Sequence, residues 1–389
     1  MTTPRPSEIK ALAGARALPP LLLVLYHFSE GHGYQGAPWF DLFVCKGYLW
    51  VEFFFALSGF ILIHVYSPRV ATFARGQGGY LDFLKARLAR LYPLHLATML
   101  IMVVMIVVLD ALAAHGHYQS IYDGPGYHPY ATWGSFIANL FLVQAWHTVP
   151  QLSWNAVAWF VSVEFFLCLI FPLYLWIAQG PLWRGFALIA AGLAVLWQMA
   201  HIFGHGLDIT HDFGILRGMA DFAIGVGFAM LYRDLMKRGF GARPEWQFTL
   251  AQLLVFAVFV YAMYNTGWSH QALDFWVVPP MTALIFTLTF DRGLLARLFS
   301  TRPFLVLGEW SFAIYMGQTA WLQFIRYAKE RLYPAMSDNP VVHMIEPAAL
   351  VLVCTLWGWL LYVTIEKPAN AALRRWFAQQ TKREAQVLS

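Results

Sequence analysis

Charged residues are scarce in this sequence. Asp, Glu, Lys and Arg together make up 12% of its 389 residues, whereas hydrophobic residues make up 59%. Soluble domains average about 25% charged and roughly 45–50% apolar residues. A chain with so few charges cannot cover a water-exposed surface, which excludes an ordinary soluble domain. The composition predicts an all-α, polytopic membrane protein, because helices satisfy their own backbone hydrogen bonds inside a bilayer.

Cysteine is also scarce, which argues against a disulfide-stabilised protein and against a cysteine-based metal site. The three cysteines, Cys45, Cys168 and Cys354, are odd in number and have no motif spacing. They therefore indicate neither a disulfide framework nor a thiolate metal site. Among the thirteen histidines, His201 and His205 have helical ligand spacing, but no further ligand is fixed beside them. The sequence predicts no metal site.

Long apolar runs are abundant, and their lengths predict about ten membrane spans. The runs lie near 13–30, 45–66, 91–114, 154–178, 185–203, 214–232, 246–265, 271–290, 304–326 and 344–366. A further run, WGSFIANLFLVQAW at 133–146, is shorter. If this run does not cross, nearly all Lys and Arg residues between spans fall on one side, as the positive-inside rule requires. We therefore expect 133–146 to be a short re-entrant or interfacial segment.

This layout also predicts the organisation of the whole chain. Residues 1–389 form a single membrane domain with no soluble domain, and a cytoplasmic tail begins at about residue 367. Both termini are expected in the cytoplasm and the protein in the inner (plasma) membrane, with membrane lipid around it. The net charge of +5 follows the cytoplasmic loops rather than a basic domain, so no nucleic-acid partner is expected.

Two ionisable residues in the first span indicate function, because such residues are costly in hydrocarbon. Arg16 and His27 are eleven residues apart. At about 100° per residue they lie within roughly 20° of the same helix face, about 16 Å apart along the axis. One face of this span therefore carries a fixed cation near one membrane surface and a titratable imidazole near the other.

Glu52 in the second span is expected at the depth of His27 if the two spans form an antiparallel hairpin. A carboxylate beside an imidazole orients the ring and raises its basicity, which a general base requires. The alternative is a structural ion pair that satisfies two buried polar groups. Arg217 and Asp221 in the sixth span, at i and i+4, are interpreted as such a structural pair.

Further candidates lie toward the cytoplasmic side. Arg87 and Arg90, in LKARLARLYP, share one side of a helix, and Arg binds phosphate in a bidentate manner. Topology anchoring or contact with lipid head groups is the alternative. Ser58, in LSGF, either lets helices pack closely or lines a substrate site. No base stands at a spacing that would make it a nucleophile.

Several motifs occur in a fixed order along the chain: the first-span Arg and His, VEFFFALSGFIL, RLARLYP, WFVSVEFFLCLIFPLYL, GEWSFAIYMGQ and IEKP. In this combination the sequence resembles the membrane acyltransferase 3 family over essentially its whole length. The resemblance implies a bundle of about ten spans that moves an acyl group, usually acetyl, from cytoplasmic coenzyme A to a hydroxyl of a glycan or other acceptor. Acetyl-CoA would then be a donor substrate, and no cofactor would be bound permanently.

The resemblance also assigns site residues by position. Arg16 and His27 match the first-span motif, Glu52 the carboxylate before the Phe pair, Arg87 and Arg90 the cytoplasmic basic motif, and Glu164 the acid of the SVE motif. The SVE match lacks the second acid and the Tyr that are common after it, so Glu164 alone carries that site.

The late motif departs from the family pattern. Relatives tend to end it with His, whereas this chain has Gln318 three residues after Tyr315. A second catalytic histidine is therefore not expected there. Ser311, Tyr315 and Gln318 fall on one polar helix stripe, which either lines an acceptor groove or hydrogen-bonds to neighbouring spans.

Together these observations predict an integral-membrane O-acyltransferase that acts on a cell-surface or lipid-linked saccharide. His27, oriented by Glu52, would deprotonate the acceptor hydroxyl, while Arg16, Arg87 and Arg90 would bind the donor's phosphates. Direct transfer and a relay through acyl-His27 both remain open. The rival hypothesis is a transporter or flippase for an acyl donor or lipid-linked sugar, although the inverted repeats common in transporters are not visible.

Overall fold

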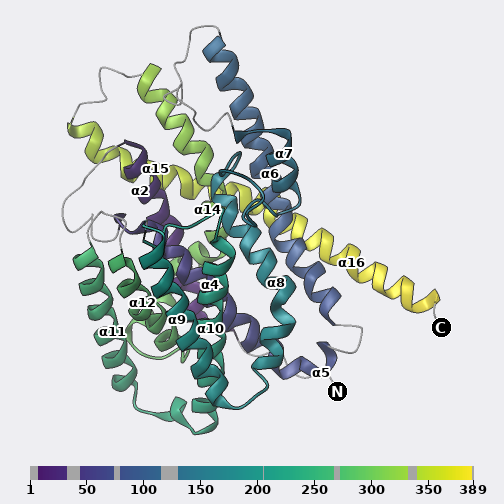
Figure 1. The fold of residues 1–389 in the computed structure, drawn as a ribbon, viewed down its shortest axis with the longest axis vertical. Coiled ribbons are helices and arrows are strands. Elements are labelled where there is room, and N and C mark those ends of the chain that lie inside the picture. Colours follow the sequence, from purple (N-terminus) through teal and green to yellow (C-terminus); the bar gives the residue numbers. More distant parts are fainter. Residues whose placement is uncertain are drawn as a thin grey trace.

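A computed structural model describes residues 8–32, 44–73, 79–114, 130–204, 206–266, 272–331 and 340–387 of the chain. Regular secondary structure in these ranges consists entirely of helices, most of which run side by side along the long axis of the molecule (Figure 1). The predicted all-α fold is therefore confirmed. The elements that matter below are α1 (Lys10–Ala15), α2 (Leu18–His32), η1 (Gly47–Leu49), α4 (Trp50–Tyr66), α6 (Tyr80–Ala114), α7 (Trp133–Leu140), η4 (Ala156–Ala158), α8 (Trp159–Ile177), α9 (Leu182–Ile202), α10 (Gly214–Lys237), α11 (Glu245–Thr266), η6 (Ala272–Val277), α12 (Val278–Leu288), α13 (Leu294–Phe299), α14 (Arg302–Arg331), α15 (Pro340–Leu361), η8 (Tyr362–Glu366) and α16 (Lys367–Val387).

Eight helices in the described part of the chain are long and apolar enough to cross a membrane. They cover Lys10–Ser29, Gly47–Arg69, Tyr80–Leu109, Ala156–Ile177, Leu182–Ile202, Gly214–Lys237, Glu245–Thr266 and Ile345–Gln380. The other two predicted spans are a shorter apolar helix, Ala272–Leu288, and α14, which has 30 residues but is more polar. Residues 133–146 contain only the eight-residue helix α7. At about 12 Å, α7 is too short to cross, as the sequence predicted.

The first span is not the continuous helix that the sequence predicted. Its first part, α1, ends at Ala15, and α2 begins at Leu18. Pro19 and Pro20 follow directly; neither has a backbone N–H to continue the helical hydrogen bonds across Arg16. Arg16 therefore lies at the break in the span rather than on a straight helix with His27.

Glycines bring the central helices into backbone contact. A Cβ atom added to Gly225 of α10 would lie 1.9 Å from the carbonyl oxygen of Ala56, and one added to Gly59 of α4 would lie 2.3 Å from that of Phe222. Such a close approach is possible only without side chains at these positions. As a result α10 packs directly against α4, and it also packs against α9.

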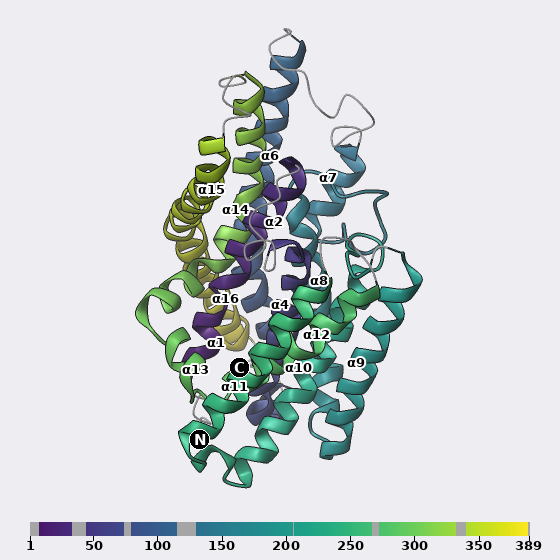
Figure 2. The ribbon, with the colours of Figure 1, turned by 90° about the vertical axis from the view of Figure 1, so that its left-hand side faces the viewer.

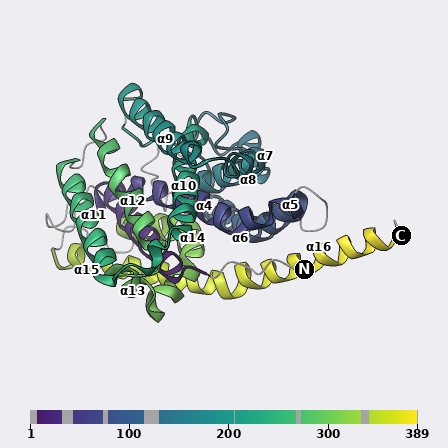
Figure 3. The same cartoon turned by 90° about the horizontal axis from the view of Figure 1, so that it is seen from below.

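The C-terminal part of the chain changes direction beside the bundle. Helix α15 continues into the single π-helical turn η8, from which α16 projects away from the other helices (Figure 3). Helix α16 packs against α6, and the Lys85 ammonium lies 6.0 Å from the ring centre of Phe377. Helix α1 and the last described residues of α16 both lie in the lower half of the molecule in Figure 2. The predicted tail from about residue 367 is thus an ordered helix.

Candidate functional site

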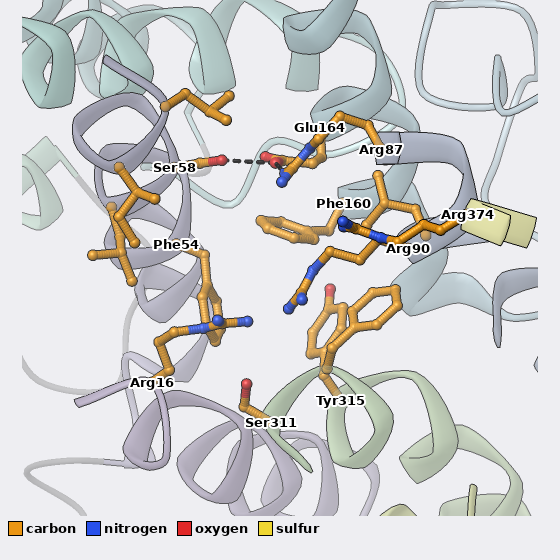
Figure 4. Close-up of a pocket in the computed structure, with 15 residues that line it drawn as sticks. Arg16, Phe54, Ser58, Arg87, Arg90, Phe160, Glu164, Ser311, Tyr315 and Arg374 are labelled. Carbon is orange, nitrogen blue, oxygen red and sulfur yellow. Dashed lines mark hydrogen bonds and ion pairs between the residues drawn. The ribbon is translucent and has the colours of Figure 1, made fainter. Parts of the chain in front are cut away.

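A cavity of about 260 Å³ lies between α4, α6, α8 and α14, with Arg16 at one wall (Figure 4). The polar residues that line it are Arg16, Ser58, Arg87, Arg90, Glu164, Ser311, Tyr315 and Arg374. All of these except Arg374 are positions that the sequence analysis named as candidates. The break after α1 places the Arg16 guanidinium at this cavity, across from the two arginines of α6.

Glu164 holds one of these arginines in place. Its Oε1 atom lies 2.5 Å from Nη2 of Arg87 and accepts a 2.7 Å hydrogen bond from the Ser58 hydroxyl. Ser58 therefore lines the cavity, whereas the adjacent Gly59 makes the close helix contact. The two roles considered for the LSGF motif, lining a site and close packing, thus belong to neighbouring residues. Glu164, the acid of the SVE motif, therefore both lines the cavity and positions Arg87.

The positive charges of the other arginines at this cavity are less well balanced by carboxylates. Among the described residues, neither Arg16 nor Arg90 donates a hydrogen bond to a carboxylate. The electrostatic interactions of Arg16 include repulsion by Arg90 and Arg87 and attraction by Glu366. Arg374 of α16 extends toward Arg90 (Figure 4) and repels it. Four guanidinium groups thus converge near two carboxylates, those of Glu164 and Glu366.

A second, smaller cavity of about 120 Å³ contains His27. Its other polar and aromatic lining residues are Tyr26, Tyr48, Trp159, Asp208, Thr210, Arg217 and Tyr315. Tyr315 lines both cavities, and its hydroxyl is fixed by a 2.8 Å hydrogen bond to the carbonyl oxygen of Val157. Arg16 and His27 therefore face two different cavities that meet at one tyrosine.

The structure corrects the prediction that Glu52 orients His27. Both Nη2 and Nε of Arg217 bind Oε1 of Glu52, at 2.6 Å and 2.8 Å, and both side chains are fully buried. Glu52 thus forms a structural ion pair, but its partner is Arg217 rather than His27. The glycine contacts draw α10 against α4 and bring Arg217 to Glu52. Among the described residues no hydrogen bond or ion pair joins Arg217 to Asp221, so the predicted direct pair is not formed, although the two charges attract each other.

Gln318 is the other candidate site residue that the structure places away from both cavities. Its side chain is fully buried and its Nε2 atom donates a 3.0 Å hydrogen bond to the Tyr315 carbonyl oxygen. It lines neither cavity, whereas Ser311 and Tyr315 of the same stripe line the larger one. The stripe is therefore divided between cavity lining and hydrogen bonding within the helix.

Three charged residues were not singled out from the sequence: Arg374 and Asp208, which line the cavities, and Glu366, which attracts Arg16 and Arg90. Glu366 lies in the IEKP motif, which was noted only as part of a resemblance, and Arg374 lies in the segment taken as a tail. Asp208 lies between two helices, in a stretch without a recognisable motif. No group of three metal-ligating residues occurs in the ranges that the structure describes, and His205 lies outside them.

Comparisons with known proteins point to one family. Residues 9–363 match the acyltransferase 3 family model, described as an acyltransferase domain. The chain is 26% identical over 397 residues to "Acyltransferase MdmB" of Streptomyces mycarofaciens, which covers 96% of this chain and 94% of that protein. It is also 36% identical over 96 residues to "Protein 2 in picA locus" of Rhizobium radiobacter, covering 25% of this chain and 44% of that protein. No solved structure matches the chain.

Proposed function

The chain belongs to the acyltransferase 3 family, and from this premise we propose that it moves an acetyl group from acetyl-coenzyme A to a hydroxyl of a saccharide. The observation that carries this proposal is the convergence of Arg16, Arg87, Arg90 and Arg374 on one cavity. Like charges held together in a partly apolar site repel one another, and a bound polyanion removes that repulsion. Coenzyme A carries several phosphate groups, which guanidinium groups bind in a bidentate manner.

The size and lining of the two cavities suit a long donor that enters from one side. The larger cavity, at about 260 Å³, is smaller than most drug-sized ligand pockets, so it takes only part of the donor, and the nucleotide end lies toward Arg374. The apolar walls, which include Phe54, Leu57 and Phe160, suit the pantetheine arm. In this pose the thioester lies near Tyr315, where the second cavity begins.

The chemistry at His27 follows from that placement. His27 takes the proton of an acceptor hydroxyl, the oxygen forms a bond to the thioester carbonyl carbon, and the carbon–sulfur bond breaks. The same proton then passes from His27 to the departing thiolate. Glu52 has no direct part in this step, because it is bound to Arg217.

The acceptor is assigned to the smaller cavity. Trp159, Tyr26 and Tyr48 present aromatic rings there, and Thr210 adds a hydroxyl; such surfaces suit the mixed polar and apolar faces of a sugar. The acceptor class is therefore a cell-surface or lipid-linked saccharide. The arginine cavity is placed on the cytoplasmic side and the His27 cavity toward the outer side, in the inner membrane with both termini cytoplasmic, as the loop charges suggest.

The experiment that tests this proposal uses the purified full-length protein in detergent. Radiolabelled acetyl-CoA is incubated with lipid-linked saccharides or lipopolysaccharide from cells that lack the protein. We expect label on the saccharide that mild alkali releases, since it is an O-ester, and competition by unlabelled coenzyme A. Labelled acetyl phosphate serves as the control donor. Absence of alkali-labile label with every saccharide would overturn the proposal, and a transporter would give that result.

A further inference from the structure

Asp208 is the acidic residue among the described residues that line the His27 cavity. It lies in the connection between α9 and α10, outside any helix, where the Ile209 N–H donates a 2.9 Å hydrogen bond to the Leu207 carbonyl oxygen, and it is half-buried. Both neighbours in sequence, Leu207 and Ile209, are buried. With Leu207 and Ile209 packed into the core, the side chain between them is the one that reaches the cavity.

Two charged residues from different helices fix the backbone on either side of Asp208. The Leu207 N–H donates a 3.3 Å hydrogen bond to Oδ2 of Asp274. The Ile209 carbonyl oxygen accepts a 3.0 Å hydrogen bond from Nη1 of Arg217. Backbone atoms immediately before and after Asp208 are thus tied to side chains that are themselves fully buried.

Each of these two anchors belongs to a buried ion pair. Nζ of Lys46 lies 2.6 Å from Oδ1 of Asp274, whose Oδ2 also accepts a hydrogen bond from the Tyr48 hydroxyl. Arg217 is paired with Glu52, and it also donates a 2.9 Å hydrogen bond to the carbonyl oxygen of Tyr48. All four ion-pair side chains are fully buried. Buried ion pairs are weak contributors to stability compared with apolar packing, so their meeting at one three-residue segment calls for another role.

We propose that Asp208 is the positioning residue of His27. In this role its carboxylate accepts a hydrogen bond from one ring N–H of His27, which leaves the other nitrogen free to take the proton of the acceptor hydroxyl. The carboxylate also stabilises the imidazolium that forms until the proton passes to the thiolate. The role predicted for Glu52 thus belongs to a residue in a connecting segment.

The charges around His27 agree with this assignment. The ionisable groups that share its cavity are Tyr26 of α2, Tyr48 of η1, Arg217 of α10 and Tyr315 of α14, besides Asp208. Arg217 is a cation, and its charge is balanced by Glu52. Arg217 attracts Asp208 as well. Asp208 is the carboxylate that lines this cavity among the described residues, which makes it the group to supply negative charge to the imidazolium. This inference rests on the proposed role of His27 as the base.

The first test compares two substitutions of Asp208 with a control in the same segment. Asp208→Asn should lower kcat for acetyl transfer on the order of 10²-fold, with the Kd for coenzyme A unchanged, because the donor binds at the other cavity. Asp208→Glu keeps the charge and should recover part of that loss. Asp212→Asn, which changes an acid four residues later that lines neither cavity, should match the parent. Melting temperatures in detergent identify any variant that is misfolded.

The second test asks whether Asp208 acts through His27. In a His27→Ala background, Asp208→Asn should cause no further loss of transfer, because a residue that orients an absent ring has nothing left to orient. Equal rates for Asp208→Asn and the parent, losses that multiply in the double variant, or no recovery in Asp208→Glu would each overturn the inference. These outcomes differ from failure of the proposed function, in which the parent itself transfers no label from acetyl-CoA.

Discussion

The two cavities differ in how their charges are balanced. In the larger cavity, Arg16 and Arg90 donate no hydrogen bond to a carboxylate among the described residues, and Arg374 adds a further cation. In the smaller cavity, the cation Arg217 is fully buried and bound to Glu52. The larger cavity therefore has positive charge available for a ligand. The positive charge beside the smaller cavity is already paired within the protein.

This difference separates two uses of buried charge in one membrane bundle. Removing an ionisable group from water costs several kcal/mol, and that cost is offset either by a partner in the chain or by a ligand. Arg217, paired with Glu52, fixes the backbone around the His27 cavity. Among the described residues, Arg87 is the one arginine of the larger cavity that forms an ion pair with a carboxylate. We infer that unbalanced charge marks the donor site and balanced charge marks the frame of the acceptor site.

The largest expected effect comes from removing the proposed base, His27, while the arginine cavity is left intact. His27→Ala should reduce acetyl transfer by about 10²- to 10⁴-fold, the usual contribution of a general base. The Kd for coenzyme A should stay within about twofold of the parent, because the arginine cavity is intact. Steady-state rates with radiolabelled acetyl-CoA and calorimetry with coenzyme A measure the two quantities. The control is His201→Ala, an exposed histidine outside both cavities.

Retention of more than about a tenth of the parent rate by His27→Ala would show that another group takes the hydroxyl proton. A parallel loss of coenzyme A binding would show instead that the two cavities are not separate in function.

The next effect concerns stability rather than rate. Glu52→Gln removes the carboxylate that is bound to the fully buried Arg217, and loss of one partner of a buried pair costs about 3–5 kcal/mol. The melting temperature in detergent should fall clearly. Glu309→Gln, which changes an exposed carboxylate, should alter stability by no more than about 0.5 kcal/mol. If Glu52→Gln melted like the parent while transfer fell, Glu52 would act in the chemistry and the pair would not be structural.

Composition and motif order were sufficient to predict many of the helices and most of the residues that line the larger cavity. Apolar run lengths located eight helices that are long and apolar enough to cross a membrane, because a bilayer of fixed thickness selects helices of a given length. The positive-inside rule excluded 133–146 as a span, and α7 is indeed too short to cross. The order of motifs brought Arg16, Arg87, Arg90, Glu164 and Ser58 into one list, and these five residues line one cavity.

The partner of Glu52 could not be predicted in the same way. Sequence spacing gives the depth of a residue along its helix, and depth alone made His27 a reasonable partner. Which helix faces Glu52 depends on how α10 rotates against α4, and this is decided by backbone contact at Gly225 and Gly59. Asp208 was missed because it lies in a connection whose path is fixed by tertiary hydrogen bonds. No periodicity reveals such a path.

A moderate effect is expected at the donor site. Arg90→Ala should weaken binding of coenzyme A by about tenfold to a hundredfold, since a hydrogen bond to a charged group contributes about 1.5–3 kcal/mol. The parent Kd should rise with salt, because the charges are partly screened, and the variant should show a shallower dependence. Calorimetry over a range of salt concentrations measures both. An unchanged Kd would return Arg90 to the alternative role of topology anchor or lipid contact.

The smallest effect tests whether α16 belongs to the donor site. Arg374 and Arg375 are adjacent, exposed and chemically identical, but only Arg374 lines the cavity. Successive helix residues point about 100° apart, so Arg375 is directed elsewhere. Arg374→Ala should weaken coenzyme A binding by about twofold to fivefold, the range of an exposed ion pair, and Arg375→Ala should leave it unchanged. Both variants lose one positive charge, so equal weakening would mean that α16 contributes only to the general potential of that face. A loss confined to Arg374→Ala, and abolished at high salt, would place the C-terminal helix at the donor's phosphates.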